Sequence, residues 1–135
     1  MRVLCDTNTL ISAAIAKGKP RKLLLKALAN EFVLTTSNEL LGELEEVIAR
    51  PKFKLSSFEK SKSVATVRKT AEIVKVQSDF KVVKDDPDDN MILNAAYDGK
   101  ADYIVTGDHD LLGLKEFEGI GIVTASKMLE ILEGG

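Results

Sequence analysis

Four acidic side chains stand at positions where solubility alone explains a charge poorly: Asp6, Glu43, Asp89 and Asp108. Asp6 and Asp108 each follow an apolar run, and Glu43 and Asp89 border the apolar positions of two predicted helices. Carboxylates that meet in one place repel one another at neutral pH unless a cation compensates them. Because such a site offers only oxygen ligands, it predicts a hard divalent ion, Mg²⁺ or Mn²⁺.

The usual chemistry of a carboxylate site of this kind is hydrolysis of a phosphodiester, in which one or two ions activate water and stabilise the leaving oxygen. No nucleophilic side chain is then required. The chain has one cysteine, Cys5, inside an apolar run, and one histidine, His109, between two aspartates. We interpret Cys5 as a buried apolar side chain. His109 is interpreted as an exposed turn residue and not as a general base.

Each acid also has a structural interpretation. Asp86, Asp88 and Asp89 stand at the start of a predicted helix and could cap it or complement its dipole, and this role is favoured for Asp86 and Asp88. Asp108 could cap a short helical turn, and Glu43 could be a solvated residue on the flank of its helix. Asp6 is the hardest to explain in this way, because it interrupts an apolar segment. Taken together, the acids favour one shared site over coincidence.

The elements that must position these acids alternate along the chain, which predicts an α/β fold with helices on both faces of a mainly parallel sheet. About four or five strands are expected. Because the carboxyl ends of parallel strands share one edge, Asp6 and Asp108 should meet there. The expected strands are 2–5, 32–35, 102–106 and 121–124, with 73–76 as a strand or a helix end. The expected helices are 10–16, 21–30, 36–50, 57–71, 87–97, a turn at 111–112, and 126–132.

Three helix starts carry explicit predictions. Thr36 and Glu39 have the spacing of a capping box, which would start the third helix at Thr36. Ser126 is expected to cap the last helix. Pro87 suits the first position of the helix that follows Asp86.

Length and composition predict one domain over residues 1–135, with 44% hydrophobic and 30% charged residues. No apolar run is long enough to cross a bilayer and no signal peptide is evident, so we expect a cytoplasmic protein without membrane contact. The net charge of −2 hides an asymmetry, because residues 17–75 hold 13 of the 19 basic and 7 of the 21 acidic residues. Basic side chains there could contact RNA phosphates, although a solvated surface explains each equally well: Lys17, Lys19, Arg21, Lys22, Arg50, Lys52 and Lys54.

The ordered set of motifs resembles the PIN domain, and most of all the PIN-family toxins of prokaryotic toxin–antitoxin pairs, the VapC-type ribonucleases. The resemblance covers nearly the whole chain. Each piece is weak alone, whereas their order is specific. The pieces are Asp6-Thr7-Asn8-Thr9-Leu10, Glu43 within residues 38–44, Asp86-Pro87-Asp88-Asp89-Asn90 ahead of Ala95-Ala96, and residues 101–112 with Thr106-Gly107-Asp108-His109-Asp110.

The resemblance implies a three-layer α/β/α fold and a metal-dependent endoribonuclease acting on single-stranded RNA, with one or two Mg²⁺ or Mn²⁺ ions. It also implies a homodimer and a separately encoded antitoxin that blocks the acidic pocket. Catalytic and metal-ligand roles carry over to Asp6, Glu43, Asp89 and Asp108. Asp110 matches a further family acid that shares the ligand role with Asp108, and Asn8 and Thr106 match polar residues that orient the acids.

Several alternatives stay open or are disfavoured. Asp88 and Asp89 are adjacent, so either could be the third ligand; Asp89 suits the family's helix better. A haloacid-dehalogenase-type phosphotransferase would need an aspartate at position 8, which is Asn8. A dinucleotide-binding module would need G-x-G-x-x-G after the first strand, and this motif is missing from the sequence. A PIN nuclease of RNA maturation or decay, or a non-catalytic PIN-like scaffold that binds RNA or protein, remains possible.

Overall fold

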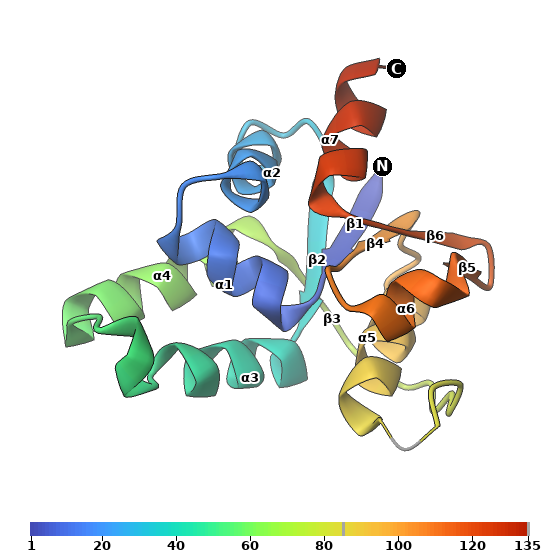
Figure 1. Cartoon of the computed structure of the whole chain (residues 1–135), viewed down its shortest axis with the longest axis horizontal. Helices are drawn as coiled ribbons and strands as arrows, with labels where there is room; N and C mark the ends of the chain where they lie inside the picture. Colours follow the sequence, from blue (N-terminus) through green and yellow to red (C-terminus); the bar gives the residue numbers. More distant parts are fainter. Residues whose placement is uncertain (85, 135) are drawn as a thin grey trace.

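A computed structural model of the chain describes residues 1–84 and 86–134. Six strands form one sheet in the order β3-β2-β1-β4-β6-β5, in which every neighbouring pair is parallel except β5 and β6 (Figure 1). The prediction of an α/β fold with a mainly parallel sheet is confirmed. The strands are β1 Arg2–Cys5, β2 Val33–Ser37, β3 Glu72–Val74, β4 Tyr103–Val105, β5 Glu116–Phe117 and β6 Ile120–Val123.

Strand β5 was not among the four or five strands expected from the sequence. It pairs antiparallel with β6, and the hairpin between them turns at Glu118 and Gly119. Both residues have positive φ, 50° and 81°, as a tight hairpin turn requires. A strand of two residues carries too little alternation to be recognised from sequence.

Helices cover both faces of the sheet, which gives the expected three layers (Figure 1). Successive residues of β1 point to opposite faces: Val3 and Cys5 pack with α1, α2, α4 and α7, whereas Leu4 packs with α5 and α6. The helices are α1 Thr7–Ile15, α2 Lys19–Leu28, α3 Asn38–Ile48, the 3₁₀ turn η1 Pro51–Phe53, α4 Ser57–Thr70, α5 Pro87–Asp98, α6 His109–Leu114 and α7 Ala125–Gly134.

Helix α3 contributes to both cores. Leu41 and Leu44 belong to the first apolar cluster and Leu40 to the second. These leucines are buried, whereas Glu43 on the same helix is half-buried and lines the pocket described below.

The cap predictions for Thr36 and Ser126 were wrong. Thr36 is paired with Ile73 inside β2, and the hydroxyl of Ser37 accepts the Leu40 N–H at 3.2 Å. Pairing with β3 extends the strand by two residues and moves the start of α3 accordingly. At the last helix the cap lies two residues before Ser126, because the hydroxyl of Thr124 accepts the Lys127 N–H at 3.2 Å.

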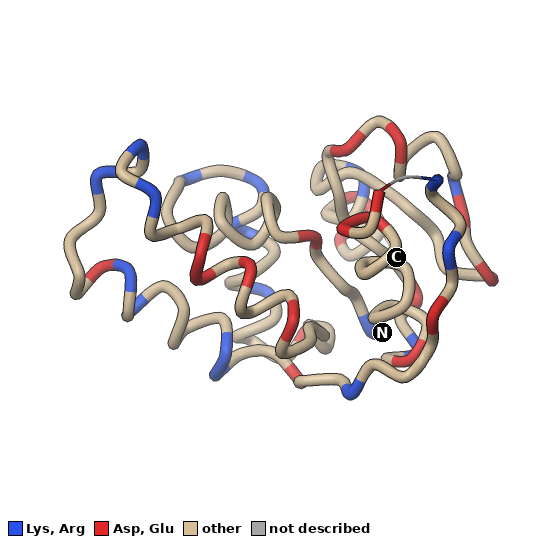
Figure 2. Tube along the Cα trace, turned by 90° about the horizontal axis from the view of Figure 1, so that it is seen from below, with Lys and Arg blue, Asp and Glu red and all other residues tan. Residues whose placement is uncertain are grey.

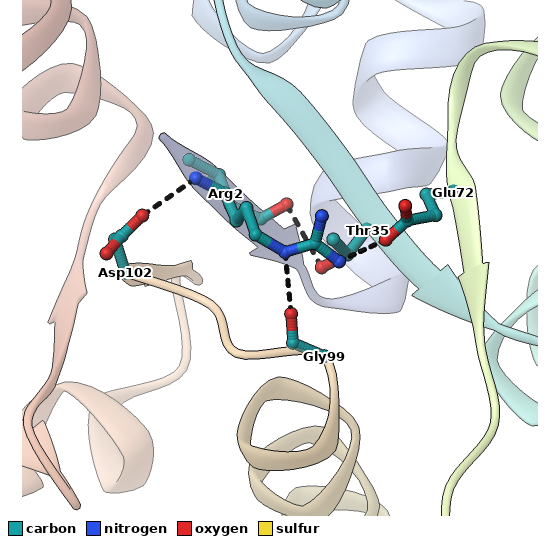
Figure 3. A network of polar contacts seen from close by, with 6 residues as sticks. Arg2, Thr35, Glu72, Gly99 and Asp102 are labelled. Carbon is teal, nitrogen blue, oxygen red and sulfur yellow. Dashed lines mark hydrogen bonds and ion pairs between the residues drawn. The ribbon is translucent and has the colours of Figure 1, made fainter.

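At the amino edge of the sheet, Arg2 ties four elements together (Figure 3). Its Nε donates to the carbonyl of Gly99 at 2.8 Å, and its guanidinium pairs with Glu72. The backbone N–H of Arg2 donates to the Asp102 carboxylate at 2.8 Å. These contacts link β1 to β3, to the end of α5 and to the residue before β4. The charged side chains of Arg2, Glu72 and Asp102 therefore each have a hydrogen-bond partner within the chain.

The charge asymmetry of the sequence is visible in space. Figure 2 shows Lys and Arg positions at the outer end of the molecule where α3 passes into α4, and Asp and Glu positions gathered on the side of α5 and α6. Arg21 has a structural role, since its guanidinium donates to the carbonyls of Ala13 and Ala14 at the end of α1. Among the described residues, no helix combines the length and the apolar character needed to span a membrane.

Candidate functional site

An acidic pocket of about 180 Å³ opens at the carboxyl edge of the sheet. The four acids proposed from the sequence line it together, although they come from four separate elements. Asp6 follows β1, Glu43 lies in the second turn of α3, Asp89 in the first turn of α5, and Asp108 caps α6. The remaining lining residues are Thr7, Asn8, Asp86, Asp88 and Ile92.

Asp6 is held at the centre of this arrangement. Its backbone N–H continues the β1–β4 pairing by donating to the carbonyl of Val105 at 3.1 Å. One carboxylate oxygen accepts the Thr9 N–H at 2.8 Å, which caps α1, and the other accepts the Thr106 hydroxyl at 2.5 Å. Asp6 is only 8% exposed, so these donors offset part of the cost of burying its charge.

Thr106 connects two acids of the pocket. Its hydroxyl donates to Asp6 and accepts the backbone N–H of Asp108 at 3.0 Å. Asp108 in turn accepts the Asp110 N–H at 2.7 Å as the cap of α6. The contacts of Thr106 are those that an orienting residue needs. Asn8 lines the pocket at an exposed position.

Asp89 is the most unusual carboxylate of the site. It is 6% exposed, and its Oδ2 is buried without a hydrogen-bond partner among the described residues. Its pKa is raised to about 7, chiefly because the group is buried, and further because Asp108, Asp86 and Asp110 place negative charge nearby. The adjacent Asp88 is exposed, so burial distinguishes the two acids that the sequence left open.

Three of the acids approach one another closely enough to share an ion. One carboxylate oxygen each from Asp86, Asp89 and Asp110 lies within 4.8 Å of the others. Opposite ligands of one Mg²⁺ lie roughly 4.2 Å apart, so small side-chain movements would complete the contact. An all-oxygen donor set and a buried oxygen without a partner both fit a hard divalent cation.

Asp86 was assigned mainly a capping role from the sequence, and it has that role: its Oδ1 accepts the Asp89 N–H at 3.1 Å. It also belongs to the acid cluster and lines the pocket, which sequence reasoning missed. A cap uses one carboxylate oxygen and leaves the other for a ligand. The Thr7 hydroxyl was missed as well; it lines the pocket and is buried without a hydrogen-bond partner among the described residues.

Nucleophilic side chains play no part in the pocket as described. Burial raises the pKa of the Cys5 thiol, and the neighbouring Asp6 raises it further, so the thiol stays protonated. His109 is exposed at the first position of α6 and does not belong to the residues that line the pocket. The site therefore offers carboxylates, an amide and hydroxyls, which suit metal-assisted hydrolysis.

Comparisons with known proteins agree with the geometry. A family model described as PIN domain matches residues 2–110. The uncharacterized protein MJ1680 of Methanocaldococcus jannaschii is similar, with 33% identity over 120 residues that span 86% of this chain and 76% of that protein. No solved structure matches the chain. The matched residues make up most of the chain and contain all the acids of the pocket. The chain therefore belongs to the PIN domain family.

Proposed function

We propose that this chain is a metal-dependent endoribonuclease that hydrolyses phosphodiester bonds of single-stranded RNA. PIN domains are typically metal-dependent nucleases, and an acidic cluster of that character is present. The observation that carries the proposal is the buried Asp89 oxygen without a partner, set among carboxylates from four elements. A protein gains nothing structurally from such a group, because an unpaired buried polar atom costs about 1–3 kcal/mol.

In this proposal Asp6, Glu43, Asp89 and Asp108 hold Mg²⁺ or Mn²⁺, with Asp110 sharing the ligand role. One or two bound ions would supply an activated water and stabilise the leaving oxygen. The residues of the chain do the positioning: the Thr9 N–H and the Thr106 hydroxyl fix the two oxygens of Asp6. The extra acid at Asp86 adds a further oxygen donor to the set.

RNA is supported as the substrate by the resemblance to PIN-family ribonucleases and by the charge distribution. Basic positions concentrate between residues 17 and 75, while the acids of the pocket come mostly from other parts of the chain. A polyanion could therefore lie along the basic part and present one phosphate to the pocket.

The central test is Asp6→Asn, which keeps the size of the side chain and its acceptor for the Thr9 N–H while removing a negative charge from the pocket. We expect cleavage of single-stranded RNA with Mn²⁺ to fall at least about 100-fold, because an ion would lose a charged ligand. The matched control is Asp102→Asn, at the opposite edge of the sheet (Figure 3). Equal activity of Asp6→Asn and wild type, with both folded, would favour the non-catalytic scaffold.

We further propose that the protein is the toxin of a toxin–antitoxin pair. In this proposal two copies of the chain form a homodimer, and a separately encoded antitoxin binds to it. The support is the order of motifs that resembles VapC-type toxins. Induced expression in a bacterial host should then arrest growth, and Asp6→Asn should not. Growth unaffected by an active nuclease would favour a role in RNA maturation or decay.

A further inference from the structure

A second pocket adjoins the acidic one and shares Asp86 with it. It has a volume of about 480 Å³ and lies between the loop 76–84 and the first turns of α5. Figure 1 shows this loop turning back beside the start of α5, before the chain enters that helix. Its lining is mainly apolar and includes Val76, Phe80, Val83, Pro87 and Met91.

The loop is fixed to α5 by side chains that recur every four residues on one face of the helix. The Asn90 amide accepts the Val83 N–H at 2.8 Å and donates to the Val83 carbonyl at 2.9 Å. The Asn94 amide accepts the Phe80 N–H at 2.6 Å and donates to the Phe80 carbonyl at 3.1 Å. Asp98 accepts the backbone N–H groups at the beginning of the loop. The backbone N–H and C=O groups of Phe80 and Val83 are thus hydrogen-bonded, as they would be in a strand of a sheet.

This pairing makes the pocket preformed. The two asparagine amides satisfy backbone groups of the loop, so its wall needs no other partner to keep its shape. The Phe80 ring is held edge-on by Tyr97 and Phe117, with centroids 4.9 and 5.1 Å away. A largely apolar pocket of this volume with a few polar groups is typical of sites that bind a small molecule or group.

We propose that this pocket takes a nucleobase of the RNA strand, adjacent to the phosphate held over the acidic pocket. The inference rests on the proposed function and names a binding site for its substrate. Because Asp86 borders both pockets, a base and the neighbouring phosphate can occupy them together. Lys81 and Lys84, both exposed, border the pocket in an otherwise acidic half of the chain and can meet the flanking phosphates.

The test compares strands that differ only in their bases. Fluorescence anisotropy would measure binding of 2′-O-methyl decamers of adenosine, of uridine and of an abasic sugar, which carry the same backbone charge and resist cleavage. We expect wild type to bind at least one base-bearing strand about fivefold or more tightly than the abasic strand, because a buried base contributes apolar and stacking contacts.

A matched pair of variants locates the preference. Val83→Trp fills the pocket and should bring the ratio of the two affinities close to one. Val82→Trp makes the same change at the preceding residue, which is 44% exposed and does not belong to the residues lining the pocket, and should keep the wild-type ratio. Met91→Trp fills the pocket from the helix side, in case the loop variant fails to fold.

The lysines give an independent measurement. The double variant Lys81→Ala, Lys84→Ala should weaken binding of all strands by a similar factor. It should also lower the slope of log affinity against log salt by about 1.4, because two phosphate contacts are lost from a single strand.

Two outcomes would overturn the proposal. One is equal affinity of wild type for base-bearing and abasic strands; another is a preference that persists in folded Val83→Trp and Met91→Trp, as expected if the pocket takes a protein side chain instead. The nuclease function is tested separately, by measuring cleavage of unmodified RNA with Mn²⁺. A base preference without cleavage would keep the pocket and reject the nuclease, and cleavage without a base preference would do the reverse.

Discussion

The two edges of the sheet treat charge in opposite ways. At the amino edge, the Arg2 guanidinium lies between the Gly99 carbonyl and Glu72, and Asp102 accepts the backbone N–H of Arg2 (Figure 3). At the carboxyl edge, acids from four elements face one another, and none of the described residues that line the pocket is basic. The charges of the first edge are paired within the chain, whereas the acids of the second edge meet no basic side chain among the described residues that line the pocket.

The difference shows where folding and function diverge. Charges that serve the fold find partners within the chain, since a buried charge without one is destabilising. Burial, and after it the negative charge of neighbouring acids, raises the pKa of Asp89 to about 7, and such an arrangement costs stability. Strongly shifted carboxylates of this kind gather at functional sites. Each of the following changes tests one edge against the other.

The largest expected effect comes from Glu43→Gln in the acidic pocket. We expect kcat/KM for RNA cleavage to fall at least about 100-fold, because the change removes one of the charges proposed to bind the ion. Glu46→Gln is the matched control on the same helix, at an exposed position outside the pocket. Similar activity of the two variants would remove Glu43 from the proposed site.

A smaller effect is expected from pH on the metal-free protein. The pKa of Asp89 is about 7 in the folded chain, against an ordinary value of 3.8, so the folded state retains a proton that the unfolded chain releases. Its contribution to stability is complete below about pH 4 and lost as the pH rises through 7. The free energy of unfolding, measured with urea, should therefore be lower at pH 8 than at pH 5.

Two comparisons sharpen that experiment. Asp89→Asn should flatten the pH dependence, because its amide does not titrate in this range. Millimolar Mn²⁺ should raise the melting temperature of wild type at pH 8 by a few degrees, since the ion binds only the folded pocket. An unchanged melting temperature across this range of Mn²⁺ would contradict a metal site.

The smallest effect is expected at the amino edge. Arg2→Ala should lower the free energy of unfolding by about 1 kcal/mol, because the partners of Arg2 are partly exposed and solvent screens the pair. The shift in melting temperature produced by Mn²⁺ should match that of wild type. A loss of the Mn²⁺ shift in Arg2→Ala would show that the two edges are coupled.

Much of the fold follows from the sequence because its signals are local. Apolar runs and amphipathic stripes predict β1, β4 and α3, and the position of Asp6 after β1 predicts its place at the carboxyl edge. The start of α3 was predicted wrongly because it depends on a distant partner. Thr36 and Ser37 stay in β2 by pairing with Ile73 and Val74, and no pattern near Thr36 contains that information.

The candidate site was predictable where an acid interrupts or borders an apolar segment, as Asp6 does after β1. Asp6 alone is hard to explain structurally from the sequence, and Glu43, Asp89 and Asp108 were assigned to the site because the acids were considered together. The structure places all four around one pocket. Asp86 was assigned to capping because its position before Pro87 fully accounts for it. Its second role depends on the location of Asp110, which only the folded chain reveals.

The spacing of the anchors along the loop beside α5 limits how this segment can vary in length. Ser78, Phe80 and Val83 are each held by a different side chain of one rigid helix, with one residue between the first two anchors and two between the next. An inserted residue within these intervals would have to bulge outwards or detach one anchor. Related chains that keep all three anchoring side chains should therefore also keep the number of residues between them, and should place their insertions before Ser78 or after Val83.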